Sequence, residues 1–166
     1  VVAPNSPQSG KGHAITINST LSFEELNLDG PQRDFSCSGT PVDCVKMALD
    51  KILPRRPDLV VSGINHGANS SINVIYSGTM SAAVEAGVEG LQAIGFSLSD
   101  LKWEADFDQA EDFIKDIILK TLENPMPKGI VLNVNIPKLP KEDIKGIKVC
   151  KQANAKWEES FDERTN

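Results

Sequence analysis

The densest run of side chains capable of chemistry covers residues 62–79, where most positions are serine, asparagine, histidine, glycine or threonine. It follows the apolar residues 59–61 and precedes a segment that predicts a helix beginning near Gly78. In an open α/β sheet, ligands bind where a strand ends in polar groups and a helix begins. We therefore expect the functional site in this segment.

The start of that helix indicates what kind of ligand to expect. Free N–H groups and the positive end of the helix dipole favour an anion such as phosphate. Ser77, Gly78 and Thr79 can direct hydroxyl and backbone N–H groups to one phosphate, with Asn69 as a further donor. The alternative is that Ser77 or Thr79 only caps the helix, and the two roles are compatible when different groups serve them.

The elements that must position these residues alternate between strand and helix. Helices are expected at residues 40–53, with Thr40 as N-cap and Pro41 in the first position, at 78–88, and at 107–124, which is amphipathic. Strands are expected at 1–4, 13–18, 34–38, 58–61, 93–97, 129–137 and 144–152, with extended structure at 21–27. This alternation predicts βαβ units in an α/β fold with a mostly parallel sheet.

Length and composition restrict the class of protein. A chain of 166 residues predicts a single domain, residues 1–166, with a substantial core. The net charge of −6 argues against a broad surface for duplex nucleic acid, and no apolar run reaches the length of a membrane span. Three cysteines without CxxC spacing favour reduced thiols and a cytoplasmic location.

Both ends of the chain suggest a longer protein. Residues 1–4 have the composition of the last part of a buried strand, so we expect residues before Val1. Residues 157–166 are polar apart from the aromatics Trp157 and Phe161, and no helix or strand signal ends there. We expect a parallel sheet that lacks a strand to expose apolar surface and an unpaired edge.

Four blocks of sequence carry a resemblance to a known family. In order, they read VVAPNSPQSGKGHAIT, SGTPVDCVKMAL, RPDLVVSGINHGAN and VIYSGTMSAAVEA. Together they resemble the survival protein SurE family, associated with stationary-phase survival, and the resemblance extends to the tail KWEESFDER. It implies a Rossmann-like three-layer fold and a hydrolase that releases phosphate from nucleoside 5′- and 3′-monophosphates. It also implies a homodimer or homotetramer, with a C-terminal extension used in subunit exchange.

The resemblance further implies one divalent cation, Mg²⁺ or Mn²⁺, in each subunit. Two of the family's ligand positions map onto Ser9 and Asn65, whereas the family's two adjacent aspartates belong to a motif upstream of the first block. Outside this context Ser9 would be an ordinary loop serine. Asn27-Leu28-Asp29-Gly30 superficially resembles the upstream motif but is interpreted as a turn. No catalytic residue is assigned, and a non-catalytic nucleotide-binding or regulatory protein remains the alternative.

Other reactive side chains receive weaker assignments. His66, and less so His13, could act as general acid toward the leaving nucleoside, but orienting or hydrogen-bonding roles are favoured for both. Lys11 could hold an anion or be a solvated loop lysine. Cys44 lies in an amphipathic helix next to the apolar Val45 and is interpreted as a packing residue.

Overall fold

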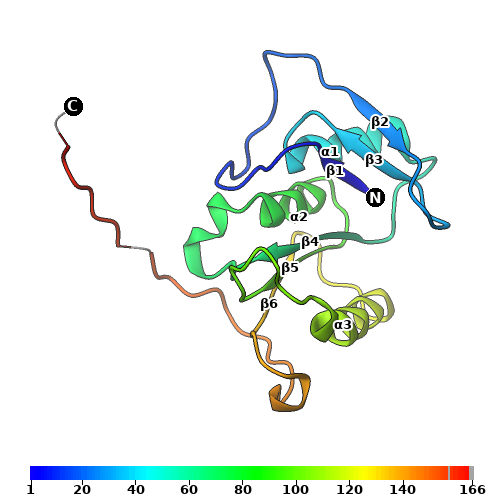
Figure 1. The fold of residues 1–166 in the computed structure, drawn as a ribbon. Coiled ribbons are helices and arrows are strands. Elements are labelled where there is room, and N and C mark those ends of the chain that lie inside the picture. Colours follow the sequence, from blue (N-terminus) through cyan, green and yellow to red (C-terminus); the bar gives the residue numbers. More distant parts are fainter. Residues whose placement is uncertain (157, 165–166) are drawn as a thin grey trace.

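The computed structural model describes residues 1–156 and 158–164. The described strands form two three-stranded sheets, ordered β1-β3-β2 and β4-β5-β6 (Figure 1). All neighbouring strands are parallel except β2 and β3, which are antiparallel. The strands are β1 (Val2–Pro4), β2 (Phe23–Leu26), β3 (Asp34–Cys37), β4 (Val60–His66), β5 (Ala93–Leu98) and β6 (Leu132–Ile136). The predicted α/β fold with mostly parallel pairing is confirmed.

The described residues form three α-helices and four short helices of other types, of which all but the last lie between strands. The α-helices are α1 (Pro41–Met47), α2 (Gly78–Val88) and α3 (Glu111–Glu123). A π-helical segment, Ala48–Ile52, continues α1, and 3₁₀ turns cover Ser71–Tyr76, Asp108–Ala110 and Lys141–Asp143. The helix predicted at 107–124 is confirmed as a 3₁₀ turn followed directly by α3.

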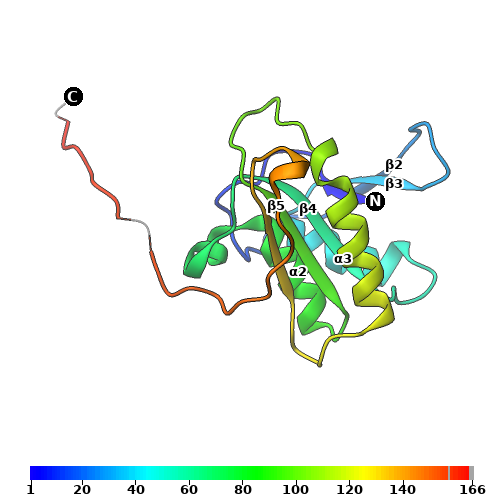
Figure 2. The ribbon, with the colours of Figure 1, turned by 90° about the horizontal axis from the view of Figure 1, so that it is seen from below.

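Strand β5 is buried along its whole length because helices cover both faces of its sheet (Figure 2). Its small residues face α2, and a side chain at Gly95 would collide with the sulfur of Met80. Ile94 and Phe96 belong to the other cluster, which contains the apolar residues of α3. Alternation along one strand therefore separates a tightly packed layer under α2 from a bulkier layer under α3.

Capping residues fix where α1 and α2 begin. The Thr40 hydroxyl accepts a hydrogen bond from Asp43 N, and the Asp43 carboxylate accepts one from Thr40 N, which completes a capping box. Ser77 caps α2 by accepting from Met80 N at 3.1 Å. The N-cap role predicted for Thr40 is confirmed.

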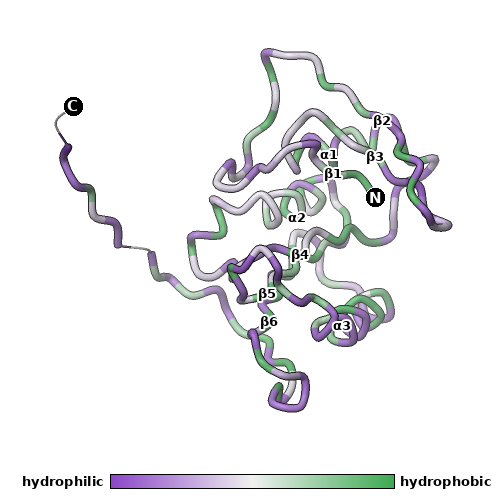
Figure 3. The backbone as a smooth tube through the Cα atoms, in the orientation of Figure 1, coloured by the Kyte–Doolittle hydropathy of each residue, from purple (hydrophilic) through white to green (hydrophobic). Residues whose placement is uncertain are grey.

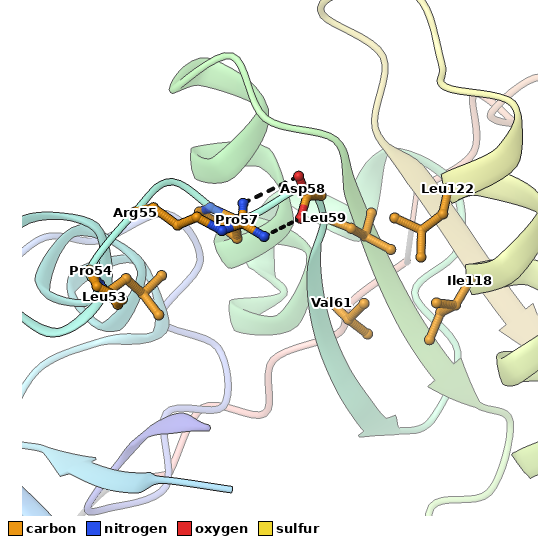
Figure 4. Close-up of a pocket in the computed structure, with 9 residues that line it drawn as sticks. All are labelled: Leu53, Pro54, Arg55, Pro57, Asp58, Leu59, Val61, Ile118 and Leu122. Atoms are coloured by element: carbon orange, nitrogen blue, oxygen red, sulfur yellow. Dashed lines mark hydrogen bonds and ion pairs between the residues drawn. The ribbon is translucent and has the colours of Figure 1, made fainter.

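The outer edge of β4 faces an apolar groove of about 540 Å³ (Figure 4). Strand β4 pairs with β5 on one side and with no described strand on the other. The groove is lined by the segment between the π-helical segment and β4, by β4 itself and by α3, including Leu53, Leu59, Val61 and Leu122. Val61 is 46% exposed there, as expected for an unpaired strand edge.

Two strands predicted from alternating sequence are wrong. Residues 13–18 form a loop, in which Ile15 and Ile17 are exposed and Thr16 N donates to the Asp43 carboxylate. Residues 144–152 are also irregular, with Val149 88% exposed. In both segments the β-branched residues lack a neighbouring strand to pair with among the described residues, so alternation alone did not produce a ladder.

The boundary of β4 also differs from the prediction. The strand was expected to end at Val61, but it continues to His66 with an irregular register between Ser62 and Asn65. Pairing with the fully buried β5 keeps these polar residues extended. The candidate ligand Asn65 is therefore positioned by a strand rather than by a flexible loop.

The C-terminal residues extend away from the rest of the chain and are largely hydrophilic (Figure 3). Phe161 is 90% exposed, whereas Trp157 lies outside the described residues. Across residues 1–156 and 158–164, every helix is too short or too polar to cross a lipid bilayer.

Candidate functional site

Asn65 lies near the carboxyl end of β4, where the strand approaches the start of α2. Its amide nitrogen donates to the carbonyl oxygens of His66 and Gly67 at 2.9 and 2.8 Å. These two bonds fix the orientation of the side chain and leave Oδ1 facing the Thr79 hydroxyl at 3.4 Å. The oxygen that a hard cation requires is thus directed at the first turn of α2.

The first turn of α2 contains a side-chain cap, Ser77, and backbone N–H groups that are available to other acceptors. The first N–H groups of a helix have no acceptor within the helix, and the Ser77 hydroxyl satisfies only that of Met80. The capping role of Ser77 is therefore realised. The N–H groups of Gly78 and Thr79 are at the position where helices bind anions.

The loop that carries Ser9 is attached to the same place. Gly12 N donates to the Tyr76 carbonyl oxygen at 3.2 Å, and an added Cβ at Gly78 would lie 3.7 Å from the Gln8 carbonyl oxygen. That Cβ would also lie only 3.0 Å from Pro41 Cγ, so the first turn of α2, α1 and the Ser9 loop approach one another closely at Gly78. The exposed Ser9 follows Gln8 directly, so the segment that carries Ser9 passes close to the start of α2.

Asn69 stabilises the loop after β4. Its side-chain nitrogen donates to Ser97 Oγ at 2.8 Å, and its backbone N donates to Asn135 Oδ1 at 2.7 Å. The Asn69 carbonyl oxygen accepts from the side chains of Asn133 and Asn135. Asn69 is only 7% exposed, and its amide nitrogen is engaged within the protein. The structure therefore gives this predicted substrate donor a role in connecting β4 to β5 and β6.

His66 lies on the α3 side of the sheet, within an aromatic cluster. Its Nδ1 is 2.9 Å from the Lys102 carbonyl oxygen. Its ring is parallel to that of Trp103 at 6.1 Å between centroids and forms a T-shaped pair with Phe107 at 5.0 Å. These contacts orient the imidazole, which agrees with the expected orienting role more closely than with that of a free general acid.

A buried carboxylate behind the site was missed by the sequence analysis. Glu85 of α2 is 7% exposed and pairs with His13 at 2.7 Å and with Lys46 at 2.8 Å. Burial would raise the pKa of Glu85, but hydrogen bonds from Lys46 and His13 outweigh burial and hold that pKa below its ordinary value. The available signal was a glutamate within the small-residue face Ala82, Ala83 and Ala86.

Asp43 holds the same loop from the other side. Its carboxylate accepts from Thr16 N and from the Thr16 hydroxyl, the latter at 2.6 Å, in addition to Thr40 N. Thr40 in turn donates its hydroxyl to the Ala14 carbonyl oxygen at 2.7 Å. The segment that leads away from Ser9 is therefore fastened to α1 and α2 through two buried acids.

The fit of these residues to a divalent cation is partial. Ser9 and Asn65 supply neutral oxygen donors of the type that Mg²⁺ and Mn²⁺ accept. Among the residues that the structure describes, no three His, Cys, Asp or Glu side chains come together to hold a metal ion. A cation bound here would need negative charge in addition to Ser9 and Asn65.

The geometry defines an open α/β protein whose candidate anion and cation site lies beyond the carboxyl ends of the strands, at a helix N-terminus. Residues 1–159 match the family model described as Survival protein SurE. The chain therefore belongs to the SurE family.

Curated relatives and a solved structure agree with this assignment. The chain is 64% identical over 165 residues to 5′-nucleotidase SurE of Flavobacterium johnsoniae, covering 99% of this chain and 64% of that protein. It is 65% identical over 168 residues to 5′-nucleotidase SurE of Christiangramia forsetii, covering all of this chain and 65% of that protein. The SurE protein of Aquifex aeolicus has a TM-score of 0.81 at 39% identity, over 92% of this chain and 60% of that one. The chain thus spans just under two thirds of the length of these relatives.

Proposed function

We propose that the complete protein is a divalent-metal-dependent phosphomonoesterase that hydrolyses nucleoside 5′- and 3′-monophosphates. The observation that carries the proposal is the meeting of Asn65, the Ser9 loop and the first turn of α2. The names of the relatives, 5′-nucleotidase SurE, support the nucleotide substrate.

Each residue of the candidate site has a defined role in this proposal. Asn65 Oδ1 and Ser9 Oγ act as cation ligands, and Asn65 keeps its orientation through the carbonyl oxygens of His66 and Gly67. The N–H groups of Gly78 and Thr79, with the Thr79 hydroxyl, hold the phosphoryl oxygens and stabilise charge that develops on them. A bound divalent cation would polarise the phosphoryl group and lower the pKa of a coordinated water.

The proposal requires acidic ligands for the cation in addition to Ser9 and Asn65, which the described residues do not supply at this site. The two adjacent aspartates implied by the family resemblance would supply it, with one Mg²⁺ or Mn²⁺ in each subunit. We also propose that the protein forms a homodimer or homotetramer, as the family resemblance implies. We propose a cytoplasmic location, in keeping with the free thiols Cys37, Cys44 and Cys150.

Hydrolysis assays on the complete protein test the function. Activity on 5′- and 3′-monophosphates should disappear with EDTA and return with Mg²⁺ or Mn²⁺. Replacing Asn65 with Ala should lower kcat roughly 100-fold or more, the scale of losing one oriented group at a phosphoryl site. Binding of nucleotides without hydrolysis under any metal condition would favour the alternative, a non-catalytic nucleotide-binding protein.

A further inference from the structure

The loop between β5 and α3 begins with residues that are hydrogen-bonded to the end of β4, beside the candidate site. In Figure 2 this loop projects beyond the carboxyl ends of the strands. Its Asp100 is 7% exposed, accepts from Lys102 N at 3.1 Å and pairs with Lys138 at 2.7 Å. Gly67 N donates to the Asp100 carbonyl oxygen at 2.9 Å, which connects the loop to the end of β4. The start of the loop is therefore attached to Gly67, two residues after Asn65.

This loop presents the aromatic ring of Trp103 to solvent. Trp103 is 89% exposed, and its ring lies nearly parallel to that of His66, with 5° between the planes. The Phe107 ring, nearly perpendicular to that of His66, supports the imidazole from another direction. The indole lies parallel to this supported imidazole, 6.1 Å away between ring centroids, and its exposed faces provide a flat apolar surface two residues beyond Leu101.

We propose that Trp103 stacks on the nucleobase of the bound nucleoside monophosphate. This inference rests on the proposed function, which places the phosphate of the nucleotide at the start of α2. The inference adds a site for the base on the α3 side of the sheet. Asn65 and His66 are consecutive, so the two halves of such a ligand would be separated by the end of β4. A flat indole suits a planar base, and every base has such a face.

Stacking also explains what kind of selectivity to expect. Recognition through a ring face does not distinguish the hydrogen-bonding edges of the bases. Trp103 should therefore favour nucleotides over phosphate esters without a base, with similar gains for purine and pyrimidine nucleotides.

Kinetics of the complete protein test this proposal. Replacing Trp103 with Ala should raise KM for AMP, GMP, CMP and UMP roughly 5- to 100-fold, the range expected for losing one stacked base. It should leave kcat within about twofold and leave KM for ribose 5-phosphate unchanged. Trp103→Phe should retain most of the affinity, and Leu101→Ala, at an equally exposed position of the same loop, is the matched control.

A fluorescence titration separates this proposal from the proposed function. In the Trp157→Phe variant, adenosine should quench the tryptophan emission of Trp103. In the double variant Trp103→Phe/Trp157→Phe, this emission and its quenching should both be absent. If wild-type protein hydrolyses neither AMP nor ribose 5-phosphate, the proposed function fails, while adenosine quenching still decides whether Trp103 binds a base. Equal effects of Trp103→Ala on AMP and ribose 5-phosphate would overturn the inference. So would emission that depends on protein concentration but not on adenosine, which would indicate contact between copies of the chain.

Discussion

Replacing Asp43 with Ala should destabilise the complete protein and release the loop that carries Ser9. Asp43 is 2% exposed, and its carboxylate accepts from Thr40 N, Thr16 N and the Thr16 hydroxyl. The Thr40 hydroxyl still caps α1 in this variant, but losing the reciprocal half of the capping box costs up to about 1 kcal/mol. Losing the hydrogen bonds from Thr16 to a charged group costs about 1.5–3 kcal/mol more. We expect a total near 3 kcal/mol, which lowers Tm by roughly 6–12 °C in a protein of this size.

The assay is thermal unfolding monitored by circular dichroism, with Asp50→Ala as the control. Asp50 is an exposed acid whose partner is the neighbouring exposed Lys51, so its loss should change stability by no more than about 0.5 kcal/mol. If Asp43→Ala and Asp50→Ala unfold at the same temperature, the carboxylate does not hold the loop and our reasoning is wrong.

The pH dependence of the Asp43 effect follows from its pKa. Burial would raise the pKa of Asp43, but hydrogen bonds from Thr16 and Thr40 outweigh burial and lower it. A lowered pKa stabilises the fold above the unfolded value, about 4, and this stabilisation is lost as pH falls through the folded value. The stability gap between wild type and Asp43→Asn should therefore narrow below about pH 4, and a constant gap would contradict this explanation.

Two further predictions concern buried groups. Glu85→Gln should lower the free energy of unfolding by about 2–4 kcal/mol in chemical denaturation, because it leaves Lys46 and His13 without their shared carboxylate; an unchanged denaturation midpoint would count against this role. Of the three cysteines of this chain, Cys150 should react quickly with a thiol reagent at pH 8, whereas Cys44 should react only after unfolding. Burial and the neighbouring Cys37 raise the pKa of Cys44 to about 12, so mass spectrometry that finds Cys44 labelled in the folded protein would refute this expectation.

The sequence predicted correctly those elements that are determined by residues close together in the chain. Thr40 and Asp43 form a capping box and Pro41 occupies the first helical position, so the start of α1 was predictable. The strands at 13–18 and 144–152 were predicted wrongly, because a strand requires a partner that alternation cannot supply. The extension of β4 to His66 was missed for the opposite reason, since pairing with β5 keeps polar residues extended.

The candidate site was predictable only in part. The serine and threonine at the start of α2 indicated an anion site, and the family resemblance pointed to Ser9 and Asn65. The long-range partners were not readable from the sequence, because Glu85 and His13 are 72 residues apart and Asn69 and Asn135 are 66 apart. Such contacts depend on how the helices and strands pack together.

Cation binding by the complete protein tests the central claim most directly. Isothermal titration with Mn²⁺ should compare wild type, Ser9→Ala, Asn65→Ala and the double variant, with the exposed Asn18→Ala as control. If both residues bind one cation, each single change should weaken Mn²⁺ affinity about tenfold or more, and the two effects should not be additive. Mn²⁺ affinity that is unchanged by either Ser9→Ala or Asn65→Ala, in protein that remains folded, would contradict the account.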